Sequence, residues 1–196
     1  MTTTSTGRGW RTVDIVVAAV VAVAFGVVFL AWNALYAAAD PFFAFLRPAQ
    51  AILYGVWLLP GVLVGLIVRR PGAAFFGAFI SAAVSVLLGS PYGADALVSG
   101  AIQGAGAEIG FALLLYRAWN LPAAMLAGAL SGAGAAVHDL VLYYSDTGAD
   151  FWVVYVTATV ISGVLIAGIG GWLLLRAIVA TGALGAFAAG GEQRQV

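Results

Sequence analysis

Two ionisable residues lie side by side within a long apolar stretch of this chain. His138, the only histidine of the sequence, precedes Asp139 in SGAGAAVHDLVLYY. Adjacent residues of a helix point about 100° apart, so these two side chains cannot face the same point. The residues leave open which of the two faces a ligand. We expect His138 to contact the ligand or to orient an acid, and Asp139 to bond mainly to a neighbouring helix. A neutral His138 that bridges two helices is the alternative.

A second polar pair lies in IQGAGAEIGF, where Gln103 precedes Glu108. A rise of about 1.5 Å per residue places Glu108 near the bilayer midplane. The same count places Gln103 and His138 at a similar depth, roughly 9–12 Å below the outer membrane surface. A charged group at mid-membrane costs at least about 2.5–3.5 kcal/mol, so it usually faces a cavity or a partner. We interpret Glu108 as the counter-charge for a cationic ligand, and we expect His138 either to contact that ligand or to orient Glu108. A protonated or hydrogen-bonded packing residue is the alternative.

Aromatic and amide side chains occupy the same ends of the apolar segments. A pocket for a flat organic ligand needs such groups for stacking and hydrogen bonding. The opposite half of the segments is almost purely aliphatic, which predicts a polar, aromatic-lined pocket that opens to one side. Tryptophan and tyrosine at segment ends also form ordinary interfacial belts, which is the alternative for each of them. The candidates are Trp32, Asn33, Tyr54, Trp57 and Trp152.

The composition places all of these residues in a membrane. The chain is 63% hydrophobic and 8% charged, with a mean hydropathy of +1.06, whereas soluble domains have about 25% charged residues. The sequence has no lysine and therefore no Walker A phosphate loop. It also has no cysteine, and its single histidine and two methionines make a poor transition-metal site. GxSG, HExxH and GxGD motifs are absent, so we expect no enzyme, no metal, no cofactor and no nucleic-acid partner.

Six apolar segments predict an all-α integral membrane protein with six transmembrane helices and both termini in the cytoplasm. Cytoplasmic loops collect arginine, and this topology places seven of the eight arginines inside, with only Arg47 outside. We expect a polar tail over residues 1–11, a membrane domain over 12–179, and a loosely ordered Gly/Ala-rich tail over 180–196. The aromatic loop 40–48 could close over a ligand. The expected spans are 12–36, 51–68, 73–89, 95–116, 122–144 and 151–179.

Small residues repeat at helical spacing in every segment but the second, and such ladders mark contact faces between membrane helices. Internal packing is the expectation for most of them. The ladder of the first segment, formed by Ala18, Ala22 and Gly26, is the best candidate for docking a partner membrane protein.

Several stretches resemble the YkoE family in this order: ILYGVWLLPG, VRRPGAAF, LLGSPYG, IQGAGAEIGF, LPAAMLAGA and VISGVLIAG. The likeness covers about residues 10–185. That family comprises substrate-binding S components of energy-coupling factor (ECF) transporters, assigned to thiamine or its hydroxymethylpyrimidine precursor. The resemblance implies a six-helix protein of the bacterial plasma membrane that captures its ligand from outside.

The resemblance also implies partners, namely a transmembrane coupling (T) subunit and cytoplasmic ATPase subunits. In S components small residues of the first helix typically dock the coupling subunit, which agrees with the ladder of the first segment. A stand-alone proton-coupled carrier is the alternative function, although the sequence shows no inverted repeat. The residues leave open whether the ligand is thiamine, its pyrimidine half or a related compound.

Overall fold

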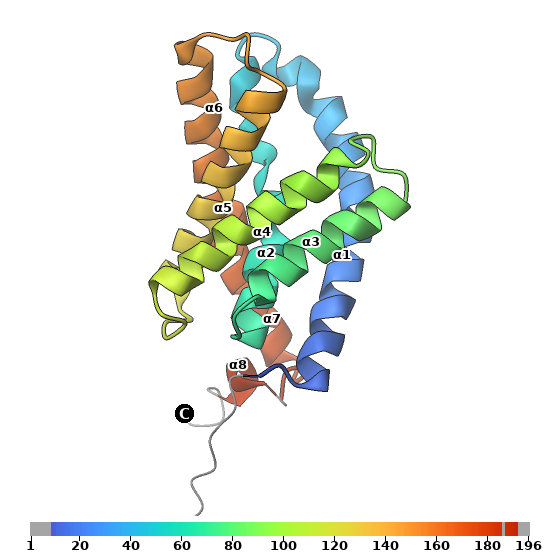
Figure 1. Cartoon of the computed structure of the whole chain (residues 1–196), viewed down its shortest axis with the longest axis vertical. Helices are drawn as coiled ribbons and strands as arrows, with labels where there is room; N and C mark the ends of the chain where they lie inside the picture. The colour runs from blue at the N-terminus through green and yellow to red at the C-terminus, as the bar shows by residue number, and fades with distance from the viewer. Residues whose placement is uncertain (1–8, 186, 192–196) are drawn as a thin grey trace, which may run out of the picture.

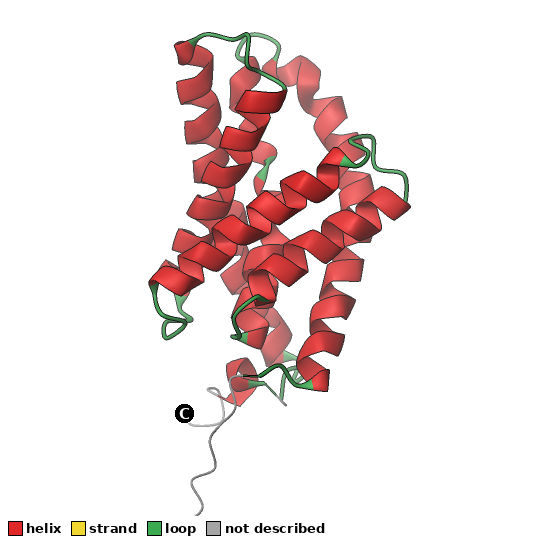
Figure 2. Ribbon diagram, viewed as in Figure 1, coloured by secondary structure: helices red, strands yellow, loops and turns green. Residues whose placement is uncertain are grey.

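The computed structural model describes residues 9–185 and 187–191, and every regular element within them is helical (Figure 2). The short elements η1 (Asp40–Phe43) and η2 (Arg47–Leu53) are 3-10 helices, and η3 (Gly163–Gly170) is a π-helix. The α-helices are α1 (Thr12–Ala39), α2 (Gly55–Val68), α3 (Ala73–Leu87), α4 (Asp95–Leu113), α5 (Leu121–Leu142), α6 (Ala149–Ser162), α7 (Gly171–Ala180) and α8 (Ala188–Gly191).

The all-α membrane fold predicted from the sequence is confirmed. Five helical stretches are long and apolar enough to cross a bilayer: Thr12–Phe43, Arg47–Val68, Asp95–Leu113, Leu121–Leu142 and Ala149–Ala180. The sixth apolar helix, α3, has 15 residues and is therefore about 22 Å long, shorter than the roughly 30 Å hydrocarbon core. Helices α3 and α4 run obliquely across the bundle, whereas α1, α5 and α6 follow its long axis (Figure 1).

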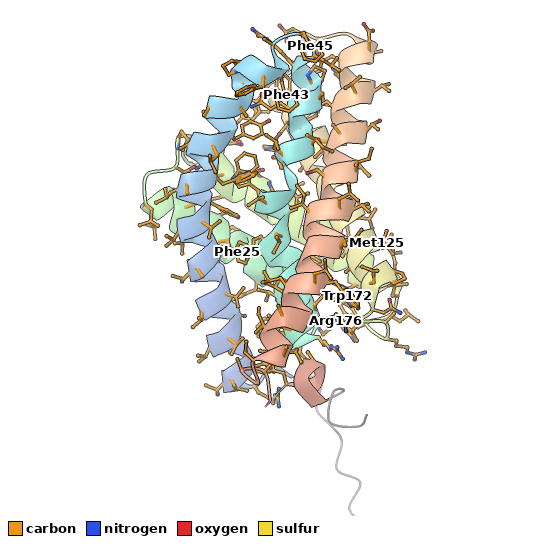
Figure 3. All side chains as sticks on the ribbon, turned by 180° about the vertical axis from the view of Figure 1, so that it is seen from behind. Phe25, Phe43, Phe45, Met125, Trp172 and Arg176 are labelled. Atoms are coloured by element: carbon orange, nitrogen blue, oxygen red, sulfur yellow. The ribbon has the colours of Figure 1, made fainter. Side chains whose placement is uncertain are left out.

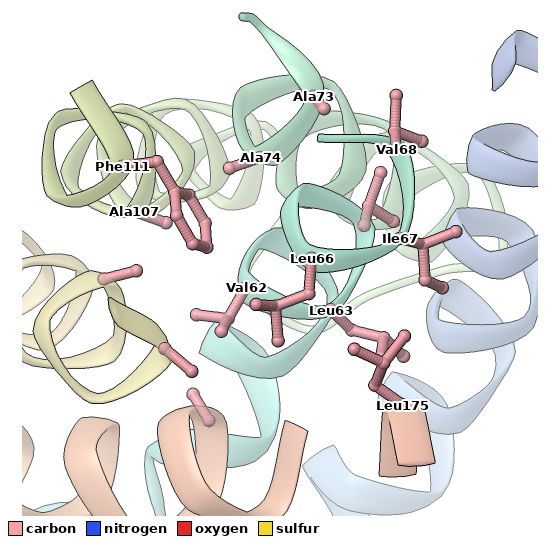
Figure 4. Packing of buried hydrophobic residues seen from close by; sticks show 14 of the residues in the cluster. Val62, Leu63, Leu66, Ile67, Val68, Ala73, Ala74, Ala107, Phe111 and Leu175 are labelled. Atoms are coloured by element: carbon pink, nitrogen blue, oxygen red, sulfur yellow. The ribbon is translucent and has the colours of Figure 1, made fainter. Parts of the chain in front are cut away.

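Helix α2 lies at the centre because its sequence, GVWLLPGVLVGLIV, is apolar on every side. Of the most apolar part of the stretch Arg47–Val68, which contains α2, 72% is buried, against 22% for that of Thr12–Phe43, which contains α1. Its Val62 and Leu66 lie in one cluster with Phe111 of α4 and Leu175 of α7 (Figure 4). The cavity described below therefore rests on a rigid aliphatic core.

Close backbone approach explains the small residues of α5 and of the last span. A Cβ atom added at Gly128 would lie 2.2 Å from the carbonyl oxygen of Gly163, and a Cβ added at Gly163 would lie 2.2 Å from that of Gly128. Neither position has room for a side chain. Gly163 also begins the π-helical turn η3, so α5 packs directly on the backbone of that segment. The expected internal role of this ladder is confirmed.

The ladder of α1 is also internal, which corrects the expectation that it is an exposed docking face. Ala18 and Ala22 are 0% exposed, and a Cβ added at Gly26 would lie 2.5 Å from Cβ of Val84 on α3. Small side chains bring α1 onto α3, so within this structure they are not available to a partner. The exposed face of α1 carries larger aliphatic residues, including Val16, Val20, Val23, Val27 and Leu35.

Both ends of the described chain lie at one end of the bundle, which we call the terminal end; the opposite end is the far end (Figure 1). At the terminal end the indole nitrogen of Trp10 donates to the carbonyl oxygen of Pro71 at 3.0 Å. Leu184 and Phe187 are buried in the core cluster, so this part of the C-terminal tail is packed rather than loose. Residues 1–8, 186 and 192–196 of the expected tails lie outside the described residues.

Candidate ligand-binding site

A cavity of about 230 Å³ lies in the far half of the bundle. It is bounded by the last turns of α1, the start of α2, the middle and end of α3, the loop that follows α3, the first half of α4, the end of α5 and the start of α6. The lining residues are Phe29, Asn33, Tyr36, Tyr54, Trp57, Ala78, Ala82, Ser85, Ser90, Tyr92, Asp95, Ala96, Ser99, Gly100, Gln103, Asp139, Tyr143, Tyr144 and Tyr155.

Trp57 is the centre of the aromatic part of this wall. Its ring centroid lies 4.8 Å from that of Tyr36, 5.1 Å from that of Tyr54 and 6.1 Å from that of Tyr92. Tyr92 belongs to the loop between α3 and α4. The predicted lid loop, residues 40–48, contributes no lining residue. Its Phe45 is 88% exposed, and Figure 3 shows Phe43 and Phe45 at the far end. The rings around Trp57 offer flat surfaces on which a planar or cationic ligand can stack.

Asn33 lines the cavity and carries an unpaired hydrogen-bond donor. Trp57 can only donate from its indole nitrogen, and it does so to Oδ1 of Asn33 at 3.0 Å. That bond fixes the amide orientation and leaves Nδ2 directed elsewhere. Among the described residues Nδ2 of Asn33 has no hydrogen-bond partner, although it is buried. An unpaired buried donor costs about 1–3 kcal/mol, which a ligand acceptor would recover.

Asp139 is the buried acid of the cavity wall. Its Oδ2 accepts a 2.7 Å hydrogen bond from the hydroxyl of Tyr155, and its Oδ1 lies 2.9 Å from Nδ1 of His138. It thus bonds to a neighbouring helix as expected, but it also lines the cavity, which the sequence did not predict. His138 lies behind it and is not a lining residue. The acid that His138 orients is therefore Asp139 and not Glu108.

Glu108 lies outside the cavity, which corrects the sequence-based interpretation. Its carboxylate accepts hydrogen bonds from the backbone N–H groups of Gly72 at 2.6 Å, Ala74 at 3.0 Å and Phe75 at 3.3 Å. These groups belong to the first turn of α3, whose N-cap, Gly72, has no side chain to satisfy them. Glu108 therefore caps α3 from the neighbouring helix α4.

The hydroxyl of Tyr116 completes this capping contact by donating to Glu108 at 2.8 Å. Burial, together with the Glu108 carboxylate, raises the pKa of Tyr116 to about 12, so the hydroxyl stays protonated as a donor. Leu115 and Tyr116 both have a φ of 54°, a left-handed conformation that is uncommon for residues other than glycine. This turn folds the end of α4 back so that Tyr116 reaches Glu108.

Four of the eight predicted binding residues line the cavity, namely Asn33, Tyr54, Trp57 and Gln103. The Gln103 amide donates to Ser99 Oγ at 2.7 Å, and its Nε2 lies 3.5 Å from the hydroxyl of Tyr54. The indoles of Trp32 and Trp152 instead bond to Leu53 and Thr147, away from the cavity. Spacing could have identified Tyr36, three residues after Asn33, and Ser99, four residues before Gln103, because both share a helix face with a candidate.

Comparison with known proteins agrees with this architecture. Residues 13–134 match the family described as the permease component of an ABC-type cobalt transport system. Over 193 residues the chain is 32% identical to a Bacillus subtilis (strain 168) protein named as an HMP/thiamine permease protein, YkoE, covering 96% of this chain and 94% of that protein. A crystal structure of an S component of an ECF transporter superposes with a TM-score of 0.89 at 31% identity, covering 95% of this chain and 94% of the other.

A helical membrane bundle with a cavity lined by aromatic and polar residues, matched over nearly its whole length to a solved S component, defines the class of this protein: it is a substrate-binding subunit of an ECF transporter. Within that class the chain belongs to the YkoE family, as the sequence motifs indicated, and it is a multi-pass protein of the cell membrane.

Proposed function

We propose that this subunit binds thiamine or its hydroxymethylpyrimidine precursor in the cavity around Trp57. The observation that carries the proposal is that two residues lining one aromatic cavity supply an unpartnered donor, Nδ2 of Asn33, and a buried carboxylate, Asp139. The volume of about 230 Å³ suits a molecule of one or two small rings, since drug-sized ligands occupy about 300–1,000 Å³.

Both ligands carry an aminopyrimidine, and its chemistry matches these groups. Its ring nitrogens accept hydrogen bonds, as Nδ2 of Asn33 requires, and its amine donates to a carboxylate such as Asp139 or to the amide oxygen of Gln103. The ring can stack on Trp57 or on the neighbouring tyrosines. Thiamine adds a thiazolium cation, for which Asp139 is the buried counter-charge and the aromatic faces supply cation–π contact.

Titration calorimetry of the purified subunit with thiamine and with hydroxymethylpyrimidine tests the proposal. We expect Asn33→Ala to lower the affinity for both ligands by about tenfold or more, equal to about 1.4 kcal/mol, because both ligands need the Nδ2 donor of Asn33. The matched control is Trp152→Phe, at an exposed residue outside the cavity, which should bind both ligands as the native subunit does. Unchanged binding by Asn33→Ala, or no binding of either ligand by the native subunit, would refute the assignment.

The proposal includes an orientation in which the cavity faces outward and the terminal end faces the cytoplasm. Of the described arginines, Arg11, Arg69, Arg70, Arg117 and Arg176 belong to the terminal end of the bundle, whereas Arg47 begins η2 at the far end. The Arg176 guanidinium stacks on the ring of Trp172. Figure 3 shows both residues toward the terminal end. A coupling subunit and cytoplasmic ATPases would then supply the energy for import, and this subunit would have no catalytic role.

Cysteine labelling tests this orientation without background, because the native chain has no cysteine. In intact cells an impermeant thiol reagent should label Thr147→Cys and should not reach Ser5→Cys or Gly191→Cys. After the membrane is permeabilised, all three variants should react. Labelling of Ser5→Cys in intact cells would reverse the topology.

A further inference from the structure

His138 lies between two carboxylates. Its Nδ1 is 2.9 Å from Oδ1 of Asp139, and its Nε2 is 3.2 Å from Oδ1 of Asp95. Asp139 belongs to α5 and faces the cavity, whereas Asp95 begins α4 and lines both the cavity and an outer groove between α4 and α5. The side chains of His138 and Asp139 are 8% and 10% exposed, and that of Asp95 is 25% exposed. We call this arrangement the Asp–His–Asp bridge.

The geometry of the bridge favours one proton more than a neutral imidazole and two carboxylates would carry. A neutral imidazole has one N–H and one nitrogen lone pair. With a carboxylate oxygen within 3.2 Å of each ring nitrogen, an unprotonated nitrogen would direct its lone pair at a negative oxygen. A second proton, on the ring or on a carboxyl group, removes that repulsion and lowers the bridge charge from −2 to −1.

The other groups that face the bridge are uncharged and do not replace this proton. Tyr143 donates to Asp95, Tyr155 of α6 donates to Asp139, and Tyr54 interacts with Asp139 from the start of α2. The remaining polar lining groups are the hydroxyls of Tyr36, Ser85, Ser90, Tyr92, Ser99 and Tyr144, the amides of Asn33 and Gln103 and the indole of Trp57. No arginine is among the described residues that line the cavity.

We propose that His138 is a specificity-determining residue that acts through Asp139. The bridge keeps its extra proton when the cavity is empty or holds a neutral ligand. It releases that proton when a cation binds beside Asp139. The inference rests on the proposed function of the cavity. The proton leaves through the partly exposed carboxyl of Asp95 to water, so one positive charge enters as another departs. Binding that releases a proton tightens as pH rises, by at most about tenfold per pH unit for one proton.

Calorimetry of the full-length subunit in two buffers of different ionisation enthalpy counts the protons exchanged on binding. We expect release of up to one proton per thiamine and none per hydroxymethylpyrimidine. The affinity for thiamine should rise with pH, while that for hydroxymethylpyrimidine, measured where its ring is unprotonated, stays nearly flat. A purely structural His138 would change neither the proton count nor this slope.

Two variants locate the proton. His138→Gln keeps a donor for Asp139 but cannot carry the extra charge, and Asp95→Asn removes the second carboxylate, so the imidazole needs only one proton. Both variants should abolish the proton release that accompanies thiamine binding and should flatten the pH dependence of thiamine affinity. If one variant does not fold, the other still provides the test. Release that persists in His138→Gln would place the proton on the carboxyl groups and overturn the role of His138. Thiamine binding without release would overturn the inference alone, whereas no binding of either ligand would overturn the proposed function with it.

Discussion

Asp139→Asn should weaken thiamine binding by about a hundredfold, equal to about 2.7 kcal/mol. The substitution keeps the shape of the side chain and an oxygen that accepts from Tyr155, but it removes the negative charge. Loss of one partner from a buried charge pair costs about 2–5 kcal/mol, and Asp139 is the most buried acid of the cavity wall. The affinity for neutral hydroxymethylpyrimidine should fall only a few-fold, because this ligand has no fixed charge to compensate.

The measurement is calorimetry with both ligands on Asp139→Asn, with Asp150→Asn as the matched control. Asp150 lies at the same far end, in the first turn of α6, but it is exposed and does not line the cavity, so its amide variant should bind both ligands normally. An equal loss for the two ligands would identify Asp139 as a hydrogen-bond acceptor and not a counter-charge. No loss for either ligand would remove Asp139 from the site.

The predicted residues that do line the cavity were selected by depth alone. Asn33, Tyr54, Trp57 and Gln103 lie near the same ends of their apolar segments, and hydropathy locates those ends well. Depth also selected Trp32 and Trp152, because it contains no information on the direction of a side chain around its helix. Asp139 was misjudged for a related reason, since bonding to another helix and facing the cavity are not exclusive when a carboxylate has two oxygens.

The ladder of α1 shows a different limit. Ala18, Ala22 and Gly26 correctly predicted a close helix contact, but small residues identify a contact and not the partner that makes it. The short, oblique helix α3 occupies this face in the structure. A sequence with several such ladders does not reveal which ones pair with one another.

Glu108 was misplaced because its depth was counted along a helix assumed to be perpendicular to the membrane. Helix α4 is oblique, and the start of α3 lies beside Glu108. The sequence does contain a relevant signal. The stretch RRPG before α3 offers no Ser, Thr, Asp or Asn as N-cap, so the first N–H groups of that helix need an acceptor from elsewhere. An acid on the adjacent helix can supply it.

Glu108→Ala should therefore destabilise the subunit by at least about 3 kcal/mol, because it leaves three backbone N–H groups and the Tyr116 hydroxyl without their acceptor. Tyr116→Phe removes only one of these bonds and should cost about 1 kcal/mol. Unfolding of the purified subunit in detergent, followed by intrinsic tryptophan fluorescence, measures both losses.

Ligand binding separates this structural role from a direct one. Helix α3 contributes Ala78, Ala82 and Ser85 to the cavity. Loosening its first turn should therefore lower the affinities for thiamine and hydroxymethylpyrimidine by the same factor. Glu108→Gln retains one acceptor oxygen and should fall between native and Glu108→Ala in both stability and affinity. A Glu108→Gln subunit of native stability that loses thiamine selectively would instead restore Glu108 as the counter-charge for the cation, in place of Asp139.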